Sequence, residues 1–126
     1  MGNTKCRGLL LYWAPVFLYA GLIFWLSSFS HPRVPAFRLS DKVYHVILYS
    51  VFGFLFIRAF QPMEKAWGRA RVLLTACLGA LIYGAIDEFH QYFVPRRSAD
   101  WSDLVADGLA GLLGGIFFLY YVRKGK

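Results

Sequence analysis

The chain has 126 residues, of which 58% are apolar, and its formal net charge is +7. A water-soluble domain of this length does not need so much apolar surface, so the composition excludes an ordinary soluble protein. Four membrane spans of about 20 residues each would use roughly 80 residues and leave only short loops, which predicts a single domain. The basic residues gather beside the apolar runs, so they indicate membrane topology and no nucleic-acid partner.

Apolar runs alternate with short polar stretches along the chain. The first run follows Lys5 and Arg7 and resembles a secretory signal, but it is long for one and no small-residue cleavage site follows it. We therefore expect an uncleaved helix, and we expect Ser40 or Asp41 to cap the second helix. The predicted fold is an all-α integral membrane bundle of four transmembrane helices, at about residues 8–28, 42–60, 72–94 and 103–122.

The charged residues predict the orientation of this bundle. Loops that stay in the cytoplasm are richer in Lys and Arg. The side with both termini holds more basic residues near the span ends, namely Lys5, Arg7, Arg58, Lys65, Arg69, Arg71, Arg123, Lys124 and Lys126. Glu64 is the one acidic residue there, and the others lie toward the opposite side. We expect a multi-pass protein of the cytoplasmic (inner) membrane, with both termini cytoplasmic and the acidic side facing outward.

Small residues recur at helical spacing in the third and fourth spans. Such residues let helix backbones approach closely within a membrane. We interpret them as packing positions: Gly79, Ala80 and Gly84 in the third span, and Gly108, Ala110, Gly111, Gly114 and Gly115 in the fourth.

Acidic residues inside the predicted spans are candidates for function. A charge at the centre of a membrane helix costs about 2.5–3.5 kcal/mol on insertion scales. Asp87 lies eight residues before Pro95, about 12 Å from the expected helix end. Gln91 follows Asp87 by four residues and shares its face, His90 would border that face, and Glu88 is rotated from it by about 100 degrees.

A second acidic row begins the fourth span. Asp100, Asp103 and Asp107 are spaced by three and four residues and would form one stripe on a helix. Three adjacent carboxylates repel one another, so some must be protonated, paired with cations or bound to a metal ion. Lys42 and His45 at the start of the second span, and Arg96 and Arg97 in the loop before the fourth, are available as counter-charges. The candidate binding residues are Asp41, Lys42, His45, Asp87, Glu88, Gln91, Arg96, Arg97, Asp100, Asp103 and Asp107. Tyr49, Tyr83 and Tyr92 are interpreted as packing or membrane-interface residues.

These residues occur in an order that resembles the VanZ-like family. The resemblance rests on four features: SDKVYH at residues 40–45, Gly53, DEFHQYFVPRR at residues 87–97, and the acidic stripe before Gly111. The similarity extends from residue 40 to about residue 115. It implies a small polytopic bacterial membrane protein, and the founding member is associated with low-level resistance to the glycopeptide teicoplanin. Its motif positions fall on Asp41, Lys42, His45, Asp87, Glu88, Gln91, Pro95, Arg96, Asp103 and Asp107, the last often Asn in the family.

The leading functional hypothesis is a site that binds or processes an anionic envelope molecule, a lipid-linked phosphate or a cell-wall precursor. Basic residues would hold the anion, and the acids would orient them or bind a divalent cation. One alternative is a lipid-phosphate hydrolase or transferase, with Asp87, Glu88, His45 or Asp103 as catalytic candidates. The others are a transporter, and an accessory protein whose polar cluster only locks the helices. The sequence contains no Ser-His-Asp order or zinc-protease motif, and it leaves the oligomeric state open.

Overall fold

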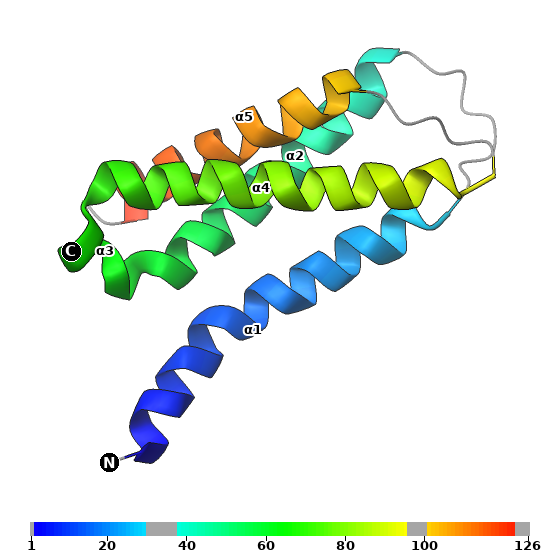
Figure 1. The fold of residues 1–126 in the computed structure, drawn as a ribbon. Helices are drawn as coiled ribbons and strands as arrows, with labels where there is room; N and C mark the ends of the chain where they lie inside the picture. The colour runs from blue at the N-terminus through cyan, green and yellow to red at the C-terminus, as the bar shows by residue number, and fades with distance from the viewer. Residues whose placement is uncertain (1, 30–37, 96–100, 123–126) are drawn as a thin grey trace.

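The computed structural model describes residues 2–29, 38–95 and 101–122, with side chains from residue 6 in the first segment and residue 42 in the second. It is an all-α structure (Figure 1). Four of its segments are long and apolar enough to cross a membrane: Cys6–Ser27, Lys42–Trp67, Arg69–Tyr92 and Trp101–Val122. The predicted multi-pass membrane fold is therefore confirmed. The elements are α1 (Gly2–Ser27), α2 (Arg38–Phe60), η1 (Gln61–Met63), α3 (Glu64–Trp67), α4 (Arg69–Tyr92), α5 (Trp101–Phe117) and η2 (Phe118–Val122).

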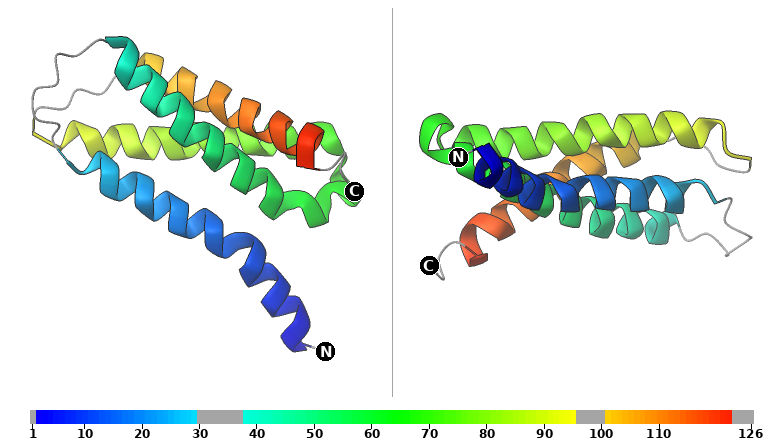
Figure 2. Two further views of the ribbon diagram at one scale, coloured as in Figure 1. Left: turned by 180° about the vertical axis from the view of Figure 1, so that it is seen from behind. Right: turned by 90° about the horizontal axis from the view of Figure 1, so that it is seen from below.

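Three of the four long helices form a tight core. Helix α5 packs along both α2 and α4. Helix α1 lies against α2 from Leu11 onward and diverges from the others toward its N-terminus (Figures 1 and 2). Val16 and Ile23 are the apolar α1 residues buried in this contact. The Tyr19 hydroxyl also donates a hydrogen bond of 2.9 Å to the carbonyl of Leu48 in α2. Helix α1 is therefore attached to the core along most of its length, and only its N-terminal turns project away (Figure 1).

Glycines set the close approach within the three-helix core. Gly53 of α2 lies directly against the Gly111 backbone of α5, and a Cβ at Gly114 would overlap the Ser50 carbonyl of α2. In lipid, where apolar burial between helices gains little, such close van der Waals contact is a main source of helix association. The predicted packing role of the fourth-span glycines is confirmed.

The helix boundaries differ from prediction at several places. The polar stretch after α2 is itself helical, and only Gly68, with a φ of 82°, breaks it before α4. Helix α2 begins at Arg38, so Ser40 and Asp41 lie inside its first turn and the expected capping role is wrong. Helix α4 ends at Tyr92. Pro95 disfavours helical backbone at the residue before it, so the helix stops ahead of the proline. Asp87 is therefore about 7.5 Å from the helix end, closer than the predicted 12 Å.

Exposed aromatic side chains mark both ends of the bundle. Phe89, Tyr92 and Trp101 project outward at the end where α4 finishes and α5 begins. Tyr120 and Tyr121 do so at the opposite end, where η2 finishes. Aromatic residues favour the boundary between the apolar membrane and water, so these positions fit the two interfaces. The expectation that Tyr92 is an interface residue agrees with its exposure.

Candidate functional site

Polar side chains are buried at the end of the core where α4 finishes and α5 begins. They come from α2, α4 and α5, and none of them is more than 8% exposed. A buried charge or polar group is costly unless it has a partner. The buried residues are His45 of α2, Asp87, Glu88 and Gln91 of α4, and Asp103 and Asp107 of α5, which we call the polar cluster.

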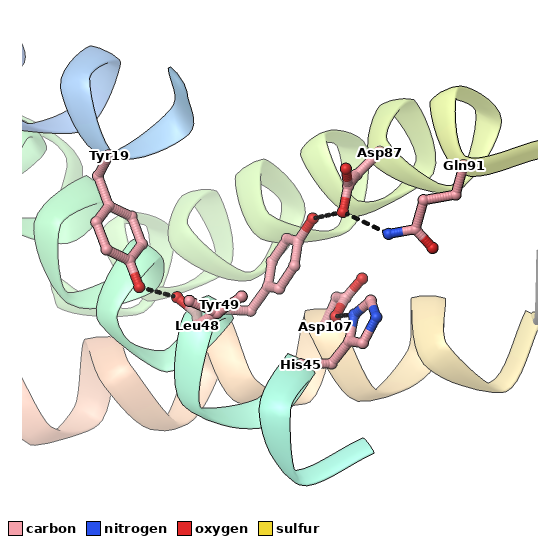
Figure 3. Close-up of polar contacts among 7 residues, drawn as sticks. All are labelled: Tyr19, His45, Leu48, Tyr49, Asp87, Gln91 and Asp107. Carbon is pink, nitrogen blue, oxygen red and sulfur yellow. Dashed lines mark hydrogen bonds and ion pairs between the residues drawn. The ribbon is translucent and has the colours of Figure 1, made fainter. Parts of the chain in front are cut away.

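Asp87 is the acceptor for two side chains. The Tyr49 hydroxyl and the Gln91 amide nitrogen each donate a hydrogen bond of 3.2 Å to its Oδ2 atom (Figure 3). The predicted pairing of Asp87 and Gln91 on one face of α4 is thus confirmed. Tyr49, interpreted from sequence as a packing or interface residue, is fully buried and belongs to the site. Its position four residues after His45 was the available signal.

Asp107 forms the second contact of the polar cluster. Its Oδ1 atom lies 3.0 Å from His45 Nδ1, and the residue is fully buried (Figure 3). The His45 ring stacks parallel to that of Tyr49, with centroids 5.9 Å apart. A Cβ at Gly84 would lie 2.6 Å from Asp107 Oδ2. Gly84, predicted as a packing position, therefore also makes room for this carboxylate.

Glu88 joins His45 and Asp107. Each of the three residues offers a potential metal-binding atom, and these atoms lie within 4.8 Å of one another. From sequence, Glu88 was placed off the Asp87 face. The structure buries both residues, because α4 packs against α2 and α5 at once and its buried face is wider than one stripe.

The polar cluster carries an excess of acidic groups. Four carboxylates are buried within it, and His45 is its one basic side chain among the residues that the structure describes. Within those residues, Asp87 Oδ1 and Asp107 Oδ2 are buried and accept no hydrogen bond. Buried carboxylates so close together require protons or a cation to neutralise them. The arrangement is thus suited to binding a cation.

A small cleft reaches the polar cluster from the side of α1. Its polar wall includes His45, Tyr49, Asp87 and Gln91, and its α1 wall is mainly apolar. The polar cluster is therefore bordered by a small cleft where α1 meets the core. The full lining is Ile23, Leu26, Ser27, Tyr44, His45, Leu48, Tyr49, Asp87 and Gln91.

Other predicted site residues do not join these contacts. His90, expected to border the Asp87 face, lies against α1 instead: its Nε2 atom is 3.0 Å from Ser28 Oγ and its ring stacks on Phe24 at 4.2 Å. Lys42 is half-buried near the start of α2. Arg96, Arg97 and Asp100, and the side chain of Asp41, lie outside the described residues.

Comparison with known proteins identifies the family. No curated protein and no solved structure matches the chain significantly. The model of the VanZ/LLP1 family matches residues 15–123, which include the C-terminal half of α1, the other three long helices and the whole polar cluster. The match bears out the resemblance carried by the motifs of α2, α4 and α5. This chain, a multi-pass membrane protein with a buried His/Glu/Asp cluster, belongs to the VanZ/LLP1 family.

Proposed function

We propose that this protein binds an anionic cell-envelope molecule, a lipid-linked phosphate or cell-wall precursor, at its polar cluster. The observation that carries the proposal is the burial of four carboxylates and an imidazole beside a cleft in an otherwise apolar bundle. Ionisable groups inside a membrane protein are costly and typically mark a ligand or ion site. Glycine contacts and apolar side chains already hold the three core helices together. The polar cluster is thus more than helix association requires.

The cleft has the amphipathic character that a lipid phosphate needs. Ile23 and Leu26 of α1 form an apolar wall opposite the polar wall. The cleft has room for about one water molecule, so α1 would move aside to admit an alkyl or prenyl chain. Lys42 and, from the sequence, Arg96 and Arg97 supply positive charge for the phosphate. The acids would orient these basic groups or share a divalent cation with the phosphate.

The proposed membrane and orientation follow from charge. The more basic side of a bacterial inner-membrane protein remains in the cytoplasm, so both termini would be cytoplasmic and the polar cluster would face outward. Ligands would then enter from the outer leaflet. A changed precursor at the cell surface would alter teicoplanin binding. Bacteria that carry the gene should tolerate more teicoplanin than matched cells with Asp87→Asn, and equal tolerance would remove this link.

Native mass spectrometry of protein extracted with its surrounding lipid tests the binding proposal. Wild-type protein should carry a phosphorylated lipid, and Asp87→Asn or Arg96→Ala should lose it at unchanged expression. Glu64→Gln is the matched control, because it removes one carboxylate charge at the opposite end of the bundle, where Glu64 pairs with Arg69. The same lipids in all four proteins, with the site variants less stable, would favour a polar cluster that only locks the helices.

A second candidate function is hydrolysis or transfer of the lipid phosphate. The observation that favours it is the contact between His45 Nδ1 and Asp107, because a carboxylate on one ring nitrogen orients the other as a general base. His45 also lines the cleft. In hydrolysis, His45 would take a proton from water as the water oxygen attacks phosphorus. The P–O bond to the lipid would break, and the lipid oxygen would receive the proton from His45 as it leaves. Phosphate release by purified protein that persists in His45→Ala would end this candidate.

A further inference from the structure

We propose that His45, Glu88 and Asp107 bind a divalent transition-metal ion, Zn²⁺ or Mn²⁺, at the junction of α2, α4 and α5. The first argument is geometric. Two ligands of one tetrahedral ion bound at about 2.2 Å lie about 3.6 Å apart. The potential ligand atoms lie within 4.8 Å of one another, and His45 Nδ1 is 3.0 Å from Asp107 Oδ1, so side-chain adjustments of about 1 Å would bring all three onto one ion.

The second argument is electrostatic. Asp107 is fully buried, its Oδ2 atom has no hydrogen-bond partner among the described residues, and Gly84 keeps the space beside that atom free of a Cβ. Within the described part of the chain, Asp87 Oδ1 is likewise buried without a hydrogen-bond partner. A divalent cation would neutralise two carboxylates without any proton uptake, and its attraction is strong where water is excluded.

The donor set selects the kind of ion. One imidazole nitrogen with two carboxylates suits Zn²⁺ and Mn²⁺, whereas Mg²⁺ and Ca²⁺ take oxygen ligands almost entirely. Within this pair, nitrogen-containing sites generally bind Zn²⁺ more tightly. Asp87 and Asp103 would remain outside the ligand set and strengthen the field that holds the ion, since both are buried in the same polar cluster.

Three protein ligands leave a coordination position for another molecule. Zinc sites with three protein ligands typically bind water or substrate in the fourth position. His45 belongs both to the proposed ligand set and to the cleft lining, so that position lies next to the cleft. In assigning it to a phosphate oxygen of the envelope molecule, the inference rests on the proposed function. The metal site itself stands on the geometry alone.

Metal binding by untagged protein in lipid nanodiscs tests the inference. After chelation, protein would be titrated with Zn²⁺ against a zinc-sensitive dye, and bound ion measured by mass spectrometry. Wild type should bind one ion per chain, with about a hundredfold weaker affinity in His45→Gln and Glu88→Gln. The matched controls are His90→Gln, whose imidazole faces α1, and Glu64→Gln at the other end. Both should bind Zn²⁺ as wild type does.

Thermal unfolding with and without Zn²⁺ provides a second test, which also applies to variants that fold too poorly for a binding titration. Zn²⁺ should raise the unfolding temperature of wild type and of both controls, because an ion that binds the folded state stabilises it, and should leave that of Asp107→Asn unchanged. The inference is overturned if wild type binds neither Zn²⁺ nor Mn²⁺, or if the site variants bind as tightly as the controls. Bound ion without co-purified lipid would refute only the proposed ligand, and bound lipid without the ion would refute only the metal site.

Discussion

The two ends of the α2–α4–α5 core are built from different chemistry. The end near α3 is apolar, with Ile57, Val72 and Phe118 buried against one another. The opposite end buries four carboxylates and His45 in the same three helices. Among the described residues, no charged residue is buried at the apolar end, so helix association in this bundle does not demand one. The comparison therefore assigns packing to the apolar end and the glycine contacts, and it supports the proposal that the polar cluster binds a ligand.

Gly114→Val should cause the largest loss of stability, because the close contact of α5 with α2 at this glycine holds the whole core together. A Cβ at Gly114 overlaps the Ser50 carbonyl, so α5 must move away from α2. We expect a loss of about 3 kcal/mol or more in unfolding free energy, measured by denaturation in detergent. The control is Gly21→Val in α1, where a Cβ has no neighbour within 4 Å. Equal stability of the two variants would contradict the assignment.

Ile57→Ala should weaken the apolar end and leave the polar cluster intact. Ile57 is 1% exposed, and truncating a buried isoleucine typically costs about 2–5 kcal/mol. Zn²⁺ affinity below the unfolding temperature should not change. Leu109→Ala, at an exposed position of α5, is the control and should alter neither quantity. A parallel loss of Zn²⁺ affinity in Ile57→Ala would show that the two ends are not independent.

Tyr49→Phe removes one hydrogen bond from the polar cluster without opening a cavity. Asp87 Oδ2 loses the hydroxyl donor 3.2 Å away. The unfolding free energy should fall by about 1 kcal/mol, the usual contribution of such a bond. Tyr92→Phe, at a strongly exposed position of α4, is the matched control and should be neutral. Identical unfolding curves for the two variants would mean that the Tyr49 hydroxyl does not stabilise Asp87.

Asp87→Asn should have the smallest effect on stability and the clearest effect on binding. The asparagine oxygen can still accept the hydrogen bonds of Tyr49 and Gln91, while one buried negative charge is removed. We expect the metal-free protein to be unchanged or up to about 1 kcal/mol more stable, and we expect it to lose the phosphorylated lipid that wild type should carry. A stability loss that matches Ile57→Ala would instead make the polar cluster a structural element.

The fold was largely predictable because span length and apolar composition are local properties. A run of about 20 apolar residues suffices to cross a membrane whatever it packs against. All four spans were found this way, with ends displaced by a few residues. The largest difference lies at residues 61–71, which were expected to connect two spans. Polar residues can also form helix, so the second span continues to Trp67 and only Gly68 separates it from α4.

The site was predictable only where its residues share one helix face. Asp87 and Gln91 are four residues apart, so their contact follows from helix geometry. The roles of Glu88, Tyr49 and His90 could not be read in this way. Each depends on how far α4 or α2 is rotated against its neighbours, and a shift of one residue turns a side chain by about 100 degrees.

By itself, the sequence determined that this chain forms four membrane helices, that its acids gather toward one side, and that it resembles the VanZ-like family. The tertiary structure alone decided which of those acids meet. Gly53, Gly84 and Gly111 let three helices approach closely enough to bury His45 against Asp107. Contact between residues far apart in sequence depends on the distance and rotation of whole helices, which are set by side-chain packing along their entire length.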